Sequence, residues 1–199
     1  TVMPLTRVAQ RVSDVQLEQA KVAIAKAAVD GFELAADVLA FDTTNVDTHS
    51  ETCTPGELAR RGHAKSKRSD LRVVGLGVLV SETGHVPLLY RTYPGNGSDQ
   101  AVLAACLGGL AQLHEALDSG EGRERPAQRT VVRDGGFWSP QLELDLDAAG
   151  YYSLISLPLG HKAAEQALQM AAQRGAMKPL PGKLSDVRAG RVRTSVGEL

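Results

Sequence analysis

The order in which strand-like and helix-like segments follow one another constrains the fold of this chain most. A short strand-like segment over 37–41, apolar from Val38 on, ends at Asp42, and the strand-like segments 71–80 and 86–90 flank the turn signal Ser81-Glu82-Thr83-Gly84. Two apolar runs on either side of a short turn predict a β-hairpin. We therefore expect three meandering strands in the first part of the sheet, and an irregular polar loop over 43–69.

Helix and strand signals alternate in the second half of the chain. Leucines recur at helical spacing over 103–117. A short strand over 130–133 leads into Asp134, Ser139-Pro140 opens the next helix, and 151–156 forms the next strand. A meander followed by alternating helix and strand predicts an α/β fold in which helices cover a mixed sheet.

Two further helices are expected at the ends of this pattern. Ser13 and Gln16 have the spacing of a capping box, and the alanine-rich segment that follows is a good helix former up to Gly31. A second helix is indicated over 163–171. Prolines and a glycine after Met177 are typical of a linker, so we expect a domain boundary near residue 177.

Opposite charges are separated along the chain, although the net charge is only −1. Residues 57–72 carry six basic and two acidic side chains, and residues 161–199 carry seven basic and three acidic ones. Such segments can bind phosphate, but they are equally typical of solvated faces. Neither a signal peptide nor an apolar run of membrane-spanning length is present, so we expect a soluble, cytoplasmic protein without a membrane partner.

Two aspartates are the main candidates for chemistry. Asp42 and Asp134 each follow an apolar strand, and ligands of α/β sheets bind at the carboxyl ends of strands. Two carboxylates brought together can bind Mg²⁺, and two such ions can act on a phosphodiester. The alternative is that both residues only cap turns. His49, Cys53 and His63 suggest zinc only weakly, because they supply three ligands at irregular spacing.

Four motifs become specific when they are taken together and in order. They are Phe41-Asp42-Thr43-Thr44-Asn45, the basic segment 57–71, Tyr93-Pro94-Gly95-Asn96-Gly97-Ser98-Asp99, and Val132–Ser139 followed by 149–155. With these motifs the chain resembles, over residues 13–199, the catalytic domain of the DDE transposases of bacterial insertion sequences. The resemblance is to the group that carries a β-rich insertion in a ribonuclease H-like fold.

The resemblance implies a definite chemistry. Asp42 and Asp134 correspond to the first two catalytic aspartates of the family, which with a glutamate hold two Mg²⁺ (or Mn²⁺) ions. These ions activate water, and then a DNA 3′-hydroxyl, for attack on phosphodiesters. The implied partners are double-stranded DNA, as transposon ends and target, and a second copy of the protein, since family members often act as dimers. The residues expected to contact DNA phosphates are Arg60, Arg61, Lys65, Lys67 and Arg68.

The chain departs from the family pattern at its third acidic residue. The family's glutamate lies on a helix after the β-rich insertion, and neither Glu165 nor Glu198 has that context. We therefore expect a helical lead-in over 1–35, an incomplete ribonuclease H-like core over 36–176, and a linker with the start of the insertion over 177–199. Such a fragment should be inactive alone. The alternatives are a metal-dependent nuclease on the same fold and a decayed, non-catalytic DNA-binding remnant.

Overall fold

The computed structural model divides into two compact units, Thr1–Ile155 and Ser156–Leu199. It describes residues 11–49, 58–119, 129–156 and 162–174, together with the pairs 178–179, 188–189, 193–194 and 197–198. The domain boundaries expected from the sequence stay predictions.

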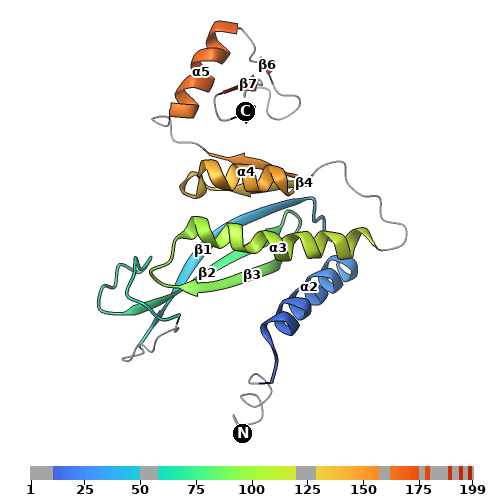
Figure 1. Cartoon of the computed structure of the whole chain (residues 1–199), viewed down its shortest axis with the longest axis vertical. Coiled ribbons are helices and arrows are strands. Elements are labelled where there is room, and N and C mark those ends of the chain that lie inside the picture. The colour runs from blue at the N-terminus through green and yellow to red at the C-terminus, as the bar shows by residue number, and fades with distance from the viewer. Residues whose placement is uncertain are drawn as a thin grey trace. The chain divides into compact units, whose positions relative to one another are not determined.

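A mixed five-stranded sheet forms the centre of the first unit (Figure 1). Its strands are β1 (Val38–Thr48), β2 (Arg72–Ser81), β3 (Pro87–Pro94), β4 (Arg129–Arg133) and β5 (Tyr151–Ile155). They lie in the order β3-β2-β1-β4-β5; β1, β2 and β3 pair antiparallel, whereas β4 runs parallel to both β1 and β5. A meander followed by parallel strands is the topology of the ribonuclease H-like fold, so the predicted fold class is confirmed.

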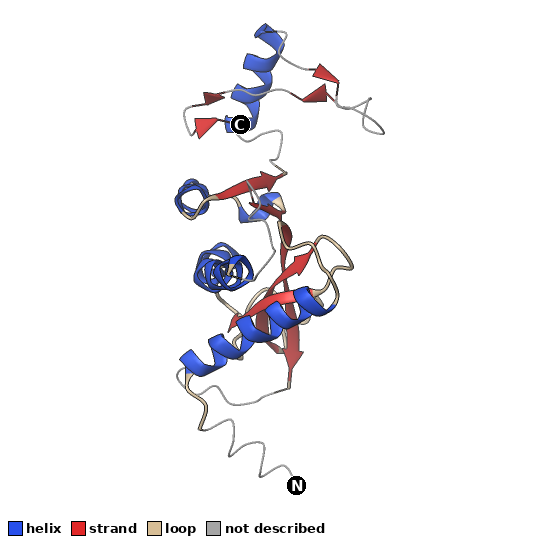
Figure 2. Ribbon diagram, turned by 90° about the vertical axis from the view of Figure 1, so that its right-hand side faces the viewer, coloured by secondary structure: helices blue, strands red, loops and turns tan. Residues whose placement is uncertain are grey.

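Three helices pack on one face of this sheet (Figure 2). They are α2 (Asp14–Gly31), α3 (Asp99–Asp118) and α4 (Pro140–Ala148). Alternate strand residues point into the core beneath them, as Leu39 and Phe41 do on β1. Leu103, Leu110, Leu113 and Leu117 of α3 belong to this core, and Cys106 is buried among them as expected, with burial raising the pKa of its thiol to about 11.

The opposite face of the sheet is not covered by any helix of the described part of this unit. Its β2 side chains, Val74 to Val80 at every second position, are only half-buried. On β5, Tyr152 and Leu154 are 57% and 59% exposed. Asp42 lies on this face too, because its neighbours Phe41 and Thr43 both point into the core.

The local capping signals in the sequence explain two of the helices. At α2, Oγ of Ser13 accepts the Gln16 N–H at 3.3 Å, and the Gln16 side chain accepts the Ser13 N–H at 3.0 Å. At α4, Oγ of Ser139 accepts the Leu142 N–H at 3.2 Å, with Pro140 next in the chain. Ser98 precedes α3, but its side chain makes no capping hydrogen bond.

The first strand is longer than the sequence predicts. The apolar run ends at Asp42 and the polar residues after it are typical of a loop, yet β1 continues to Thr48. The reason is tertiary, since β1 pairs with β2 residue by residue from Leu39↔Ser81 to Thr48↔Arg72. The prediction of a loop over all of 43–69 is therefore wrong for its first six residues.

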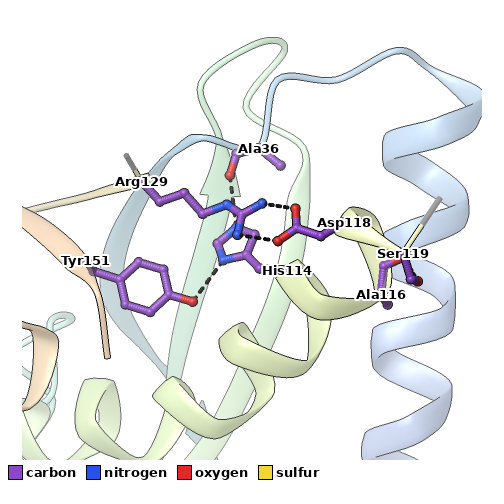
Figure 3. Close-up of polar contacts among 7 residues, drawn as sticks. All are labelled: Ala36, His114, Ala116, Asp118, Ser119, Arg129 and Tyr151. Atoms are coloured by element: carbon purple, nitrogen blue, oxygen red, sulfur yellow. Dashed lines mark hydrogen bonds and ion pairs between the residues drawn. The ribbon is translucent and has the colours of Figure 1, made fainter. Parts of the chain in front are cut away.

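A buried polar network joins the end of α3 to the sheet (Figure 3). His114 is 3% exposed; its Nε2 donates to the Ala36 carbonyl at 3.1 Å, and its Nδ1 accepts from the Tyr151 hydroxyl at 2.9 Å. Beside it, Arg129 forms a two-point ion pair with Asp118. Burial, helped by the charge of Arg129, lowers the pKa of His114 to about 4, so the ring stays neutral.

The second unit contains one helix and two short strand pairs. The helix is α5 (Lys162–Arg174), which confirms the helix predicted over 163–171. The strands are β6 (Lys178–Pro179) with β7 (Arg188–Ala189), and β8 (Arg193–Thr194) with β9 (Gly197–Glu198). In the described ranges of the whole chain, no helix combines the length and the apolar character needed to span a membrane.

Candidate functional site

The parallel ladder between β1 and β4 brings the two candidate aspartates together. Its last pair is Phe41↔Arg133, and Asp42 and Asp134 are the next residues on the two strands. Neighbouring strands lie about 4.8 Å apart, so the two backbones are adjacent at this point. Asp134 keeps an extended backbone, with φ −74° and ψ 157°. Two segments distant in the sequence thus place one aspartate each at the end of the same ladder.

The sequence predicts that Asp42 lies at the carboxyl end of its strand. In the structure it lies within the strand instead. It is the fifth of the eleven residues of β1, and beyond it β1 pairs with β2 only. The feature that matters is the end of the β1–β4 ladder. Where β4 stops at Arg133, its pairing with β1 ends, so Asp42 has no partner on β4 and Asp134 follows directly after the last paired residue.

Both carboxylates are exposed and are held in the same way. Oδ1 of Asp42 accepts the Thr43 N–H at 2.7 Å, and Oδ1 of Asp134 accepts the Gly135 N–H at 2.7 Å. In the described part of the chain, no hydrogen bond occupies Oδ2 of either residue. Hard, partly oriented oxygen atoms with one free position each are suitable ligands for Mg²⁺ or Mn²⁺.

The pair does not form a complete metal site by itself. Across the described residues, no group of three or more histidine, cysteine, aspartate or glutamate side chains is placed to hold a metal ion. The same observation applies to His49 and His63, while Cys53, the third member of the weak zinc hypothesis, lies outside the described residues. The carboxylate oxygens of Asp42 and Asp134 are the donor type that a divalent cation such as Mg²⁺ prefers, but two residues supply only part of a ligand set.

A buried ion pair lies under the second aspartate. The Arg133 side chain is 0% exposed and forms a salt bridge with Glu143 in the first turn of α4. In the described structure its Nε and Nη1 atoms have no hydrogen-bond partner. A buried arginine with one carboxylate partner depends strongly on that partner, so the Arg133–Glu143 contact fixes α4 beneath the end of β4.

A polar cleft of about 600 Å³ lies next to the chain segments that carry the two aspartates, although neither Asp42 nor Asp134 lines it. Thr43, next to Asp42, and Gly136, two residues after Asp134, both contribute to its wall. The rest of the wall comes from the second half of β1, the loop before β2, the turn after β3 and the first turn of α3. The cleft is thus lined by all four motifs that the sequence analysis singles out.

The loop over 58–69, here called the basic loop, is held firmly against the sheet. Asn45 on β1 forms two hydrogen bonds with this loop: its Nδ2 donates to the His63 carbonyl at 2.9 Å, and its Oδ1 accepts the Lys65 N–H at 3.1 Å. Arg60 exchanges two backbone hydrogen bonds with Val73, at 3.0 and 2.8 Å. The backbone of the basic loop is therefore tied to β1 and to β2 at these points.

The structure separates the five predicted DNA-contacting residues into different surroundings. Lys65 is exposed and lines the cleft, with its Nζ donating to the Thr43 carbonyl. Arg61 and Lys67 are exposed on the basic loop, and Arg60 is half-buried. Arg68 forms an exposed ion pair with Asp70, and this contact lowers the pKa of the Asp70 carboxyl to about 2. The contact of all five with DNA stays a prediction.

Residues that the sequence analysis did not assign to the site also reach it. Asp99 accepts hydrogen bonds from the Tyr93 hydroxyl at 2.6 Å and from the Thr43 hydroxyl at 3.2 Å. Burial and the bond to Asp99 raise the pKa of Tyr93 to about 12, so this hydroxyl remains a donor. Gln100 donates to the Trp138 carbonyl at 3.1 Å. The sequence motif contains Tyr93 and Asp99, but nothing in it points to Gln100.

Fold and site together define a ribonuclease H-like domain with an acidic pair suited to a divalent cation. Residues 33–195 match the family model described as the transposase DDE domain. The match covers most of the chain, and the chain belongs to this family. The transposase prediction made from the four sequence motifs is thereby confirmed at the level of the family.

Solved structures with a similar fold are distant. The Mos1 mariner paired end complex with Mn has 12% identity and a TM-score of 0.40, over 83% of this chain and 49% of that chain. The Mos1 catalytic domain gives the same identity and score over 83% and 72%. The piggyBac synaptic complex with hairpin DNA has 15% identity and a TM-score of 0.36, over 67% and 25%. No curated protein sequence matches this chain.

This chain thus spans about half the length of the Mos1 chain in the paired end complex and a quarter of the piggyBac chain.

Proposed function

We propose that the chain is part of a transposase that cuts and joins DNA at the ends of an insertion sequence. The observation that carries the proposal is the adjacency of Asp42 and Asp134 at the end of the β1–β4 ladder, in a chain of the transposase DDE family. In the first reaction, the oxygen of water bonds to phosphorus and the bond to the 3′ oxygen breaks. The 3′-hydroxyl formed in this way then attacks a phosphodiester of the target DNA: its oxygen bonds to the target phosphorus, and the bond from that phosphorus to the target's 3′ oxygen breaks, which leaves a free 3′-hydroxyl on the target strand.

In this proposal the two aspartates hold divalent cations, Mg²⁺ or Mn²⁺, of which the family's pattern implies two. The Thr43 and Gly135 N–H groups orient the carboxylates through Oδ1, which leaves Oδ2 of each residue for the metal. When bound, the cation supplies an activated hydroxyl and stabilises the charge that develops on the phosphate. A glutamate is expected as a third ligand from the family's pattern, and neither Glu165 nor Glu198 is assigned to that role.

The DNA backbone is proposed to cross the basic loop toward the cleft. Lys65 lies at the wall of the cleft, and Arg61 and Lys67 extend the positive surface along the same loop. Lysine and arginine contacts with phosphates position a duplex without reading its sequence. Recognition of the terminal repeats is therefore expected to depend on other parts of the transposase. We also expect the transposase to act as a homodimer.

The test is Mg²⁺-dependent nicking of terminal inverted repeats by the transposase that contains this chain. Asp42→Ala and Asp134→Ala should each reduce nicking by at least about a hundredfold, because each removes a metal ligand. Asp37→Ala, an exposed aspartate just before β1, is the matched control and should nick normally. Undiminished nicking by either site variant would refute the proposal. Nicking without joining of the 3′-hydroxyl to a target would favour the nuclease alternative instead.

A further inference from the structure

The first turn of α3 contacts both segments that carry the candidate aspartates. Asp99 reaches β1 at Thr43, the residue after Asp42, and Gln100 reaches the segment just after Asp134. The contacts come from consecutive residues of one helix. The start of α3 therefore supports both chain segments. The β1–β4 ladder that joins these segments ends at Phe41 and Arg133, one residue before each aspartate.

On the β1 side, the support runs through a buried threonine. Thr43 is 4% exposed; its N–H donates to Oδ1 of Asp42 at 2.7 Å and its hydroxyl donates to Oδ2 of Asp99 at 3.2 Å. Asp99 is held from its other oxygen by Tyr93 at 2.6 Å. The ring of Tyr93 lies directly over Gly75, where a Cβ would come within 2.3 Å of it. The position of Thr43, and through it the Asp42 carboxylate, is thereby fixed.

On the β4 side, the support acts on a short turn. Asp134 begins η1 (Gly135–Phe137), a 3-10 turn, and accepts the Gly135 N–H. Gln100 donates from Nε2 to the carbonyls of Trp138 at 3.1 Å and Gly136 at 3.4 Å. The rings of Phe41 and Phe137 meet edge to face, with 5.1 Å between their centroids. The turn that orients Asp134 is thus held by α3 and by β1.

We propose that Asp99 and Gln100 are positioning residues that fix Asp42 relative to Asp134 so that the two carboxylates share one divalent cation. This inference rests on the function proposed above. The carboxylates themselves are exposed and belong to segments that do not pair with each other past Phe41 and Arg133, so their spacing needs an outside support. Partners of metal ligands commonly change metal affinity by one to two orders of magnitude when they are removed.

The proposal is tested by the affinity of the 199-residue chain for Mn²⁺, measured from the free-ion signal in electron paramagnetic resonance. Asp99→Ala and Gln100→Ala should each weaken binding on the order of tenfold. Asp99→Asn should recover most of the affinity, because its amide oxygen accepts one hydroxyl and its amide nitrogen can donate to the other. Thr43→Val keeps the shape and the backbone N–H but loses the bond to Asp99, and should weaken binding in the same direction.

The matched control lies at the other end of the same helix. Asp118→Ala removes the ion pair with Arg129, which is 12% exposed, and should lower the melting temperature without changing Mn²⁺ affinity. Equal weakening by Asp118→Ala and Asp99→Ala would mean that general destabilisation is the cause, and would overturn the positioning role. Wild-type affinity in Asp99→Ala, Gln100→Ala and Thr43→Val would overturn it as well.

Failure of the underlying function has a different signature. If the wild-type chain and Asp42→Ala bind Mn²⁺ equally, the acidic pair is not a metal site and the proposed function fails with it. If Asp42→Ala loses binding while Asp99→Ala and Gln100→Ala retain it, the metal site stands and only the positioning role is rejected.

Discussion

Asp42 and Asp134 follow the same residue pair of the β1–β4 ladder although they are 92 positions apart in the chain. Both lie where that ladder ends, and each carboxylate is oriented by the backbone N–H of the next residue. The arrangement requires the whole order of the sheet, because β4 must return beside β1 after a meander and a helix. A site of this kind belongs to the fold and not to any one of its segments.

The first prediction separates function from stability at the acidic pair. Because both aspartates are exposed, Asp42→Asn and Asp134→Asn should change the free energy of unfolding by no more than about 0.5 kcal/mol. Urea denaturation followed by circular dichroism measures this. A loss of several kcal/mol in either variant would indicate a structural role for that carboxylate, contrary to our account.

The second prediction concerns acid stability. His114 has a pKa of about 4 in the folded chain and an ordinary pKa near 6.5 when unfolded. Between these two pH values the unfolded state therefore binds more protons than the folded state. The stability that neutral, buried His114 contributes is thus fully present above pH 6.5 and is lost as the pH falls toward 4. The shift corresponds to about 3 kcal/mol.

The variant His114→Gln should flatten that part of the pH dependence. The measurement is the free energy of unfolding between pH 4 and 7, taken as the difference between wild type and variant so that titrating carboxylates cancel. An unchanged slope in His114→Gln would contradict the neutral, buried state of this ring, whose hydrogen bonds to Ala36 and Tyr151 are drawn in Figure 3.

The third prediction concerns the ion pair beneath Asp134. Glu143→Ala leaves the fully buried Arg133 guanidinium without its partner, which should cost about 3 kcal/mol of folding stability. Arg133→Met combined with Glu143→Leu should cost much less, because no buried charge remains. Breaking the exposed Lys26–Asp30 pair with Lys26→Ala should cost under about 0.5 kcal/mol and serves as the control for chemical denaturation. If Glu143→Ala also lowered the free energy of unfolding by less than about 0.5 kcal/mol, the buried Arg133 guanidinium would not need Glu143 as its partner.

The fourth prediction concerns DNA binding by the basic loop. Replacing Arg61, Lys65 and Lys67 by alanine should weaken binding to a duplex of any sequence. It should also reduce the slope of log affinity against log salt by about 0.9 for each phosphate that the variant no longer neutralises. Fluorescence anisotropy at several salt concentrations measures both effects. Lys26→Ala on α2 is the control, and an unchanged slope in the triple variant would exclude the basic loop from the DNA interface.

The sequence predicts those parts of the fold that depend on local signals. The Ser13 capping box, the hairpin turn before β3 and the Ser139-Pro140 helix start are all present in the structure. In α4, the leucines alternate like a strand, but the helix buries Leu142 and Leu146 on one side and leaves Leu144 59% exposed. The capping signal is therefore more informative there than the alternation.

What the sequence does not predict depends on long-range contacts. The second half of β1 is polar and becomes a strand only through its pairing with β2. Asp99 binds Thr43 across 56 positions and Gln100 binds Trp138 across 38, and no local pattern indicates either contact. The burial and hydrogen bonds of His114 cannot be predicted from the sequence for the same reason, since its partners Ala36 and Tyr151 lie 78 and 37 positions away.

The most direct test of the central claim is whether Asp42 and Asp134 hold one and the same cation. Mn²⁺ broadens the amide NMR signals of nearby residues, and the Thr43 and Gly135 amides donate to the two carboxylates. We predict that Mn²⁺ broadens both signals at the same concentration in the wild-type chain. Either Asp42→Asn or Asp134→Asn should abolish the broadening of both. Broadening of one signal that persists when the other aspartate is replaced would contradict a shared site.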